Sequence, residues 1–313
     1  MKFTHRPYAE AGADFARLTG FVQAHGRPVR RLSTWCLGRL VDWRYMIFSH
    51  KLPIEAFCDA NAELWFDGFG ALAGFAISEN GDENIALLTT EGYQFLYAEM
   101  LDWVLQAWSC KGPCFAVEIT ANHAPGIAAL ERAGFARSET FFTYTYDLRK
   151  PLLPRVELPE GFSIVDMAST PDYRAQRLMR AEGFRGRSDL TEEEIARDLA
   201  AQAGYHANPI YHAPTDLCVR APDGIFVSGC EALIDAHNAE ADVERVCTHS
   251  AYRRRGFARA VIQECLYRLQ AMGLARASIT GYSPWAISLY ASFGGGEEST
   301  SYIYARAPST SRT

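Results

Sequence analysis

The sequence predicts a mixed α/β fold that occurs twice in one chain. With 313 residues, the chain is long enough for two domains of ordinary size. A polar segment with two prolines, PRVELPEG at 154–161, interrupts the apolar patterning and indicates a linker. The same order of elements follows on both sides of it, so we expect domains at 1–153 and 160–313.

Sequence similarity between the halves supports this duplication. IAALERAGF (127–135) aligns without gaps on ISLYASFGG (287–295), which starts 160 residues later. At the same offset, NIALLTTEGYQFLYAEML (84–101) falls on ERVCTHSAYRRRGFARAV (244–261). A constant offset over such distances is typical of duplicated domains and not of a short solenoid repeat.

The second half shows the element order most clearly. Apolar runs bounded by turns predict strands, and apolar residues spaced at 3.6 predict helices. The expected strands are FSIVDM (162–167), 216–221, 225–235, 243–248, RASITG (276–281) and 300–306, and the expected helices are 172–181, 191–203, 257–270 and 284–292. This order predicts a mixed, mostly antiparallel sheet flanked by helices, with a βαβ unit at its end.

The most informative motif lies where the strand at 243–248 meets the helix at 257–270. The connecting loop reads Arg253-Arg254-Arg255-Gly256-Phe257-Ala258, which is R-x-x-G-x-A. The first turn of a helix has unpaired N–H groups and the positive end of the macrodipole, so it can bind a diphosphate. Gly256 permits unusual backbone angles, and Ala258 keeps bulk away from a ligand.

CTHSAYRRRGFARA resembles the Q/R-x-x-G-x-G/A signature of the GNAT superfamily of acyl-CoA-dependent N-acyltransferases. SPWAISLYASFGG is similar to its second signature, an Asn-x-x-A-x-x-x-Tyr helix ending in Gly-Gly, although Ser283 stands where the family often has Asn. The pairing of two such halves is similar to the tandem members, such as mycothiol synthases. The resemblance covers residues 160–306.

The resemblance implies which residues form the site. The strand residues expected beside the pantetheine arm of the cofactor are Val246, Cys247 and Thr248. The backbone of Arg254, Arg255, Gly256 and Ala258 is expected to hold the pyrophosphate. Tyr290 is the expected general acid for the leaving thiolate, because a phenol of pKa about 10 suits a thiol of similar pKa.

The general base is open. Glu244 lies four residues before Thr248, so both are expected on one sheet face, and its carboxylate could accept a proton from the acceptor amine. A surface glutamate at a strand end is the alternative. Glu231 and His249 are weaker candidates, and we expect His249 to cap or pack. Tyr205, His206 and Tyr211 could border the acceptor pocket.

The first half lacks these groups. At the offset of 160, Arg253 falls on Tyr93, Gly256 on Leu96, Tyr290 on Leu130 and Glu244 on Asn84. The apolar framework remains, so residues 1–153 are interpreted as a degenerate copy. Asn122 or His123 is expected near the cap of its last helix.

Composition excludes several classes. A formal charge of −6 without a wider basic stripe argues against nucleic-acid binding through the three arginines. The eight cysteines are scattered in apolar runs, and Cys110 and Cys114 lack partners for a zinc site, so no metal is expected. We find no signal-peptide or membrane-spanning pattern and expect a cytoplasmic monomer or homodimer.

The expected reaction is direct transfer of an acetyl group from acetyl-CoA to a primary amine, with neither a metal nor a covalent enzyme intermediate. The acceptor is a small molecule or a peptide. The competing hypothesis is a non-catalytic module that binds acyl-CoA as a sensor or regulator.

Overall fold

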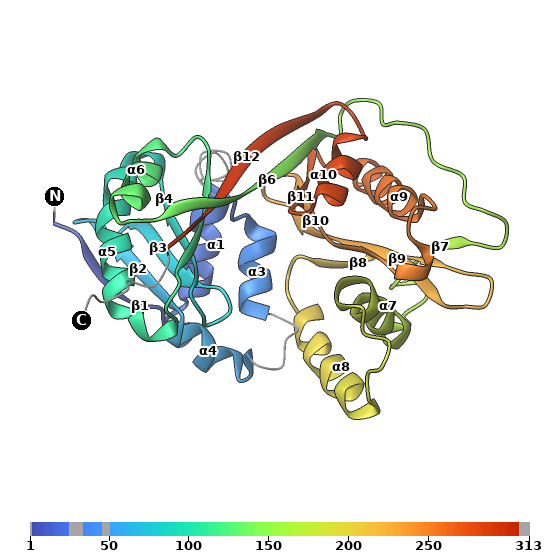
Figure 1. Cartoon of the computed structure of the whole chain (residues 1–313), viewed down its shortest axis with the longest axis horizontal. Helices are drawn as coiled ribbons and strands as arrows, with labels where there is room; N and C mark the ends of the chain where they lie inside the picture. The colour runs from blue at the N-terminus through green and yellow to red at the C-terminus, as the bar shows by residue number, and fades with distance from the viewer. Residues whose placement is uncertain (1, 25–33, 46–50, 307–313) are drawn as a thin grey trace. The chain divides into compact units, whose positions relative to one another are not determined.

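The chain forms two compact units, and each contains segments that are not contiguous in the sequence. The computed structural model describes residues 2–24, 34–45 and 51–306. The first unit consists mainly of Met1–Arg44, His50–Thr143 and Glu298–Thr313, and the second mainly of Tyr144–Glu297. Most helices and strands of both units are labelled in Figure 1.

The first unit contains a sheet in the order β1-β2-β3-β4-β5-β12. Its strands are β1 (Thr4–Pro7), β2 (Ala62–Phe66), β3 (Leu72–Ser78), β4 (Asn84–Thr89), β5 (Ala116–Thr120) and β12 (Gly296–Ala305). Its helices are α1 (Asp14–Ala24), α3 (Leu37–Tyr45), α4 (Ile54–Ala60), α5 (Tyr97–Ala107) and α6 (Ala124–Arg132), with short 3₁₀ turns η1 (Glu10–Gly12), η3 (Glu91–Leu96) and η4 (Ser109–Lys111). Only β4 and β5 pair in parallel among the strand pairs described within this unit.

The second unit contains a sheet in the order β6-β11-β10-β9-β8-β7. Its strands are β6 (Ala136–Asp147), β7 (Ser163–Asp166), β8 (Tyr211–Arg220), β9 (Phe226–Asp235), β10 (Glu240–Thr248) and β11 (Arg276–Gly281). Its helices are α7 (Tyr173–Arg185), α8 (Glu192–His206), α9 (Phe257–Ala271) and α10 (Pro284–Ala291), with the 3₁₀ turn η5 (Ser250–Tyr252). The predicted order of strands and helices in this half is confirmed, as is the mixed sheet flanked by helices.

The structure also confirms the duplication, because four successive elements recur with the predicted offset. In each pair the second element begins 160 residues after the first. The pairs are α5 and α9, β5 and β11, α6 and α10, and β6 and β12. His123 caps α6 as expected, and its Nδ1 accepts a hydrogen bond from Gly126 N at 3.0 Å.

The two halves exchange their last strands. β12, at the end of the second half, pairs antiparallel with β5 of the first unit, from Ser301 opposite Thr120 to Ala305 opposite Ala116. β6, at the end of the first half, continues into the second unit from Tyr144. The contiguous division at 1–153 and 160–313 therefore stays a prediction about the duplicated sequence, whereas the compact units draw on both halves.

The helices of the second unit cover both faces of its sheet (Figure 1). Consecutive residues of β9 show this, because neighbouring side chains of a strand point to opposite faces. A Cβ on Gly229 would lie 2.8 Å from the terminal methyl of Met179 on α7. The next residue, Cys230, instead directs its Sγ to the carbonyl of Val261 on α9 at 3.7 Å.

A buried group of charges lies between β9 and the helices α7 and α8. Glu231 accepts hydrogen bonds from Arg180 at 2.8 Å and from Tyr205 at 2.6 Å, and it also pairs with Arg245. Arg180 further contacts Asp216 at 3.1 Å. Burial alone would raise the pKa of Glu231, but Arg245 and Arg180 outweigh burial and lower it. We call these residues the Glu231 cluster.

We expect Glu231→Gln to lower the free energy of unfolding by about 3–5 kcal/mol, because the buried guanidinium of Arg180 and the half-buried one of Arg245 would lose their shared counter-charge. Chemical denaturation measures the change. Glu192→Gln is the matched control, since it removes the ion pair with Arg174 at an exposed site and should change stability little. Equal effects of the two substitutions would contradict this account of the cluster.

Candidate functional site

The site is formed where β10 and β11 separate. The two strands pair in parallel at three positions, from Glu240 opposite Arg276 to Asp242 opposite Ser278. No further pair between them is found in the described part of the chain. The ladder between β10 and β9 is irregular between Glu244 and Cys247, where β10 has one residue more than its partner. Such a bulge bends the strand and leaves backbone groups unpaired.

Arg245 occupies this bulge in an unusual conformation. Its φ is +53°, in the left-handed region that residues other than glycine rarely adopt. Its guanidinium pairs with Glu231 and donates to the Tyr205 hydroxyl at 2.9 Å. It also lies 4.5 Å from the centre of the Tyr205 ring. The Glu231 cluster therefore holds the side chain at the point where β10 bends.

Because of this bulge, the expectation that Glu244 and Thr248 lie on one face of the sheet is wrong. Their partners on β9 are Glu231 and Ser228, which are three residues apart and so face opposite sides of the sheet. Glu244 and Thr248 therefore do not share a face, because the extra residue shifts the alternation by one. Both nevertheless line the pocket described next.

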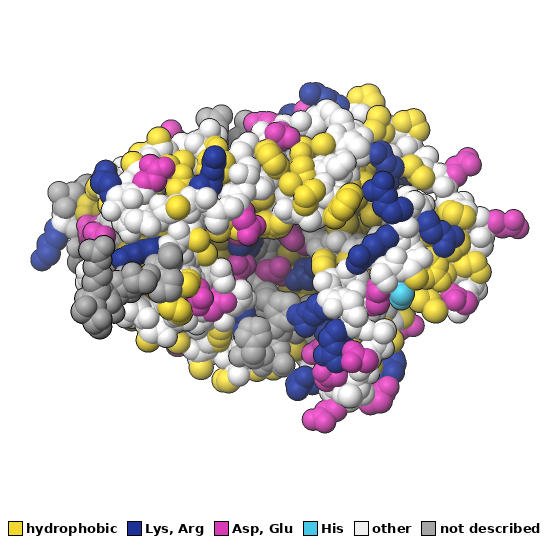
Figure 2. All heavy atoms as spheres, in the orientation of Figure 1, with side chains coloured by type: hydrophobic (Ala, Val, Ile, Leu, Met, Phe, Trp, Pro, Cys, Tyr) yellow, Lys and Arg dark blue, Asp and Glu magenta, His cyan; other side chains and the backbone are white. Residues whose placement is uncertain are grey.

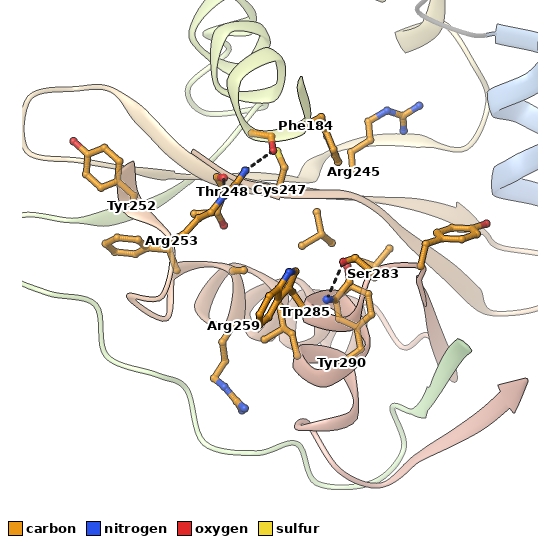
Figure 3. A pocket seen from close by; sticks show the side chains of 18 of the residues that line it. Phe184, Arg245, Cys247, Thr248, Tyr252, Arg253, Arg259, Ser283, Trp285 and Tyr290 are labelled. Carbon is orange, nitrogen blue, oxygen red and sulfur yellow. Dashed lines mark hydrogen bonds between the residues drawn. The ribbon is translucent and has the colours of Figure 1, made fainter. Parts of the chain in front are cut away.

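A pocket of about 1220 Å³ fills the gap between the separated strands (Figure 3). Val246, Cys247 and Thr248 line it from β10, and Ser283 and Tyr290 line it from the start and the end of α10. It also contains most of the predicted phosphate loop, namely Arg253, Arg254, Gly256, Phe257 and Ala258. The structure thus brings together in one cavity all the predicted site residues except Arg255.

The loop meets α9 in a geometry suited to an anion. Gly256 is the N-cap residue of α9, with φ +83° and no side-chain hydrogen bond to the first turn. A Cβ at Gly256 would meet nothing within 4 Å, so the space beside the first-turn amides is open. Arg254 is also left-handed, at φ +62°. Left-handed residues curl the backbone so that N–H groups converge on an anion.

The three arginines of the loop differ in their contacts. Arg253 is tied to the backbone, because its guanidinium donates to Gly183 O at 2.9 Å and to Thr248 O at 3.2 Å. Arg255 lies near the rings of Phe162, Tyr252 and Phe257, at 5.2–5.4 Å from their centres. Arg254 makes no hydrogen bond or ion pair with the described residues.

Arg254 therefore lines the pocket with its guanidinium donors not engaged by any described residue, whereas Arg253 is engaged and Arg255 does not line the pocket. All three arginines are exposed, and basic side chains gather on the face of the second unit seen in Figure 2.

Ser283 and Tyr290 occupy the two ends of α10. The Ser283 hydroxyl accepts a hydrogen bond from Ala286 N at 3.2 Å, so the predicted cap is confirmed. Tyr290 is 5% exposed. Burial, followed by the nearby Glu244, raises the pKa of its hydroxyl well above 10, so the group is protonated at neutral pH. No partner for this hydroxyl is found among the residues that the structure describes.

Cys247 is a poor nucleophile in this environment. Its side chain is buried and lies 3.2 Å from the Met179 sulfur. Burial raises the pKa of the thiol to about 12, so almost no thiolate forms at neutral pH. The side chain of Cys247 therefore packs as a small apolar residue of the strand.

The weaker candidates lie outside this pocket. Glu231 is engaged in its buried cluster, and His249 caps η5 by accepting from Ala251 N at 3.3 Å, as expected. His206 stacks on Tyr211 with ring centres 4.1 Å apart, next to Tyr205. Burial lowers the pKa of His206 to about 4, so this side chain is neutral at physiological pH.

Sequence reasoning missed several pocket residues. Phe184 from α7 is 56% exposed, and Trp285 from α10 is 75% exposed, although both line the cavity (Figure 3). Gly183, beside Phe184, also belongs to it, and a Cβ there would lie 3.1 Å from that of Cys247. The predicted helix ends at residue 181, so this glycine was not recognised as part of α7, where it permits the close approach. The exposed aromatic residues carried no signal for the site.

The equivalent position in the first unit is closed. Leu96, the counterpart of Gly256, is buried and has right-handed angles, with φ −71°. The Tyr93 hydroxyl donates to Asp67 at 2.7 Å, and Leu130, the counterpart of Tyr290, is fully buried in the core. The start of α5 therefore presents apolar side chains where α9 presents an open loop.

Membrane-spanning helices and metal-binding clusters are absent from the described residues. No helix among them is both long and apolar enough to cross a membrane. Within the same ranges, no group of three or more His, Cys, Asp or Glu side chains is arranged to hold a metal ion.

A known protein family matches the part of the chain that forms most of the pocket. Residues 187–294 match the model of the acetyltransferase (GNAT) family. No curated protein matches the sequence.

Solved structures match over almost the whole chain. A tandem GNAT protein from the clavulanic acid biosynthesis pathway, solved without AcCoA, superposes with a TM-score of 0.67 at 13% identity, over 99% of this chain and 100% of its own. A GCN5-related N-acetyltransferase from Sphaerobacter thermophilus has a TM-score of 0.62 at 17% identity, over 97% and 95%. A GNAT-family acetyltransferase from Colwellia psychrerythraea has 0.56 at 12%, over 97% and 99%. The chain is thus a transferase with the tandem GNAT fold, whose second half carries the GNAT acetyltransferase domain.

Proposed function

We propose that the protein is an N-acetyltransferase that moves the acetyl group of acetyl-CoA to a primary amine of a small molecule or a peptide. The observation that carries the proposal is the continuity of one pocket. It runs from the uncapped start of α9 at Gly256, along the unpaired stretch of β10, to the hydroxyl-bearing side chain of Tyr290.

Each part of this pocket suits one part of the cofactor. The first-turn amides of α9 and the unpartnered Arg254 suit a diphosphate, which gains from both hydrogen bonds and charge. Val246, Cys247 and Thr248 have no described partner in β11, and this open side of β10 suits the amides of an extended pantetheine arm, which can pair like an added strand. Backbone N–H groups at the bulge can polarise the thioester carbonyl.

The proposed chemistry is a direct attack. The unprotonated amine adds to the thioester carbonyl, the C–S bond breaks, and Tyr290 donates its proton to the departing sulfur. Glu244 is the proposed base that takes the proton lost by the amine, since its carboxylate lines the same pocket. The buried thiol of Cys247 is not used. This reaction would take place in the cytoplasm, on one site per chain, with the first half as a degenerate copy.

A non-catalytic acyl-CoA sensor is the alternative. It shares the binding residues but not the role of Tyr290. It predicts that cofactor binding survives Tyr290→Phe and that no amine in a broad panel releases thiol from acetyl-CoA or from longer acyl-CoAs.

Gly256→Val should abolish acetyl-CoA binding. The φ of +83° is unfavourable for a β-branched residue, and the new side chain would occupy the space beside the first-turn amides. Calorimetry with acetyl-CoA measures the affinity.

Gly273→Val is the matched control for this variant. Gly273 has a similar φ of +81°, but it lies at the other end of α9 and outside the pocket. The control should keep its affinity for acetyl-CoA. Unchanged affinity in Gly256→Val would refute the assignment of the loop.

Tyr290→Phe should lower kcat by about 10²-fold and leave acetyl-CoA affinity nearly unchanged, because only the proton donor is removed. Since burial raises the pKa of Tyr290, its protonated form should persist up to at least pH 10, and the wild type should lose no turnover below that pH through this group. Thiol release across a pH series measures both effects. Full activity of the variant would assign the proton to water or to another residue.

A further inference from the structure

Tyr146 contacts the helix that carries Tyr290, although it lies 144 positions earlier in the chain. It belongs to β6, at the point where the first half of the sequence enters the second unit. The side chain is 4% exposed. Its hydroxyl donates a buried hydrogen bond of 2.7 Å to the backbone carbonyl of Tyr290.

The helix α10 depends on such anchors. It has only eight residues, a length at which helices in water are not stable on their own. Its start is held by the Ser283 cap, whereas its end is followed by the left-handed residues Gly294 and Gly295. Tyr146 acts at this second end, in the same turn as the side chain of Tyr290.

The ring of Tyr146 also fits closely against the segment that follows α10. It packs edge to face on Phe293, with ring centres 6.0 Å apart. A Cβ at Gly296 would lie only 3.0 Å from Cε1 of Tyr146, so a larger residue there would press on the ring. The contacts of the ring with Phe293 and Gly296 thus hold the hydroxyl of Tyr146 on the Tyr290 carbonyl.

We propose that Tyr146 is a positioning residue, which sets the depth of the Tyr290 hydroxyl in the pocket by holding the last turn of α10. This inference rests on the proposed role of Tyr290 as the acid. A proton donor must lie within hydrogen-bond reach of the leaving sulfur, so a shift of the helix end by a fraction of an ångström lowers the rate. The hydroxyl of Tyr146 donates to the backbone carbonyl of Tyr290 and not to its side-chain hydroxyl, so Tyr146 holds the helix end and is not itself the proton donor.

Tyr146→Phe should lower kcat by about three- to tenfold and leave the KM for acetyl-CoA unchanged, because one buried hydrogen bond is lost and no pocket-lining group is removed. Steady-state thiol release measures both constants. Tyr267→Phe is the matched control: it also removes a tyrosine hydroxyl that donates to a backbone carbonyl in the second unit, that of Leu153 at 3.1 Å. The control should keep the wild-type kcat, and an equal loss in both variants would overturn the proposal.

A double-mutant cycle separates positioning from general destabilisation. When Tyr290 is already phenylalanine, there is no hydroxyl left to position, so adding Tyr146→Phe should cause no further loss of kcat. A loss that multiplies with that of Tyr290→Phe would show that Tyr146 acts elsewhere, and would overturn the proposal.

A measurement without turnover distinguishes this inference from the acid role. In protein labelled at tyrosine Cζ, the carbon-13 resonance of Tyr290 is identified by its loss in Tyr290→Phe. We expect this resonance to shift in Tyr146→Phe and to stay in place in Tyr267→Phe. A fully active Tyr290→Phe would remove the acid role while the shift still supports positioning. An unmoved resonance in Tyr146→Phe would overturn positioning itself.

Discussion

The pairing of Arg245 with the buried Glu231 is the interaction on which the site depends. It holds a residue other than glycine in a left-handed conformation, at the bulge where β10 departs from its ladder. Backbone strain of this kind persists only where surrounding contacts determine it, and here Arg180 and Tyr205 complete those contacts. The bend accompanies the separation of β10 from β11, and the separation leaves room for the pocket.

The pocket combines three features that are individually common. A helix start with open amides attracts anions, an unpaired strand edge accepts an extended chain, and a buried tyrosine keeps its proton. Here they occupy one cavity because α9 and α10 follow β10 and β11, the two strands that diverge. The first unit repeats the same succession of elements with apolar residues at the equivalent positions, so it retains the packing without the open loop.

The strand exchange gives the first half of the sequence a part in the second unit. β6 belongs by sequence to the first copy, yet its end supplies Tyr146 to the turn that carries Tyr290. β12, the corresponding strand of the second copy, pairs with β5 in the first unit. Each unit contains a strand from the other half of the sequence. The end of β6 therefore stays under structural constraint, even though residues 1–153 lack the groups that line the pocket of the second unit.

The sequence by itself determined the element order, the offset of 160 and the position of the arginine–glycine loop before α9, because these depend on local periodicity, capping residues and a glycine next to arginines. The cap at Ser283 and the start of α9 followed from that chemistry. Only the tertiary structure decided three other features. These are the sheet face on which Glu244 lies, the different contacts of the three arginines, and the exchange of the last strands between the halves. A bulge shifts the alternation without a local signal, and contacts such as those of Arg253 with Gly183 or Tyr146 with Tyr290 join residues that only folding brings together.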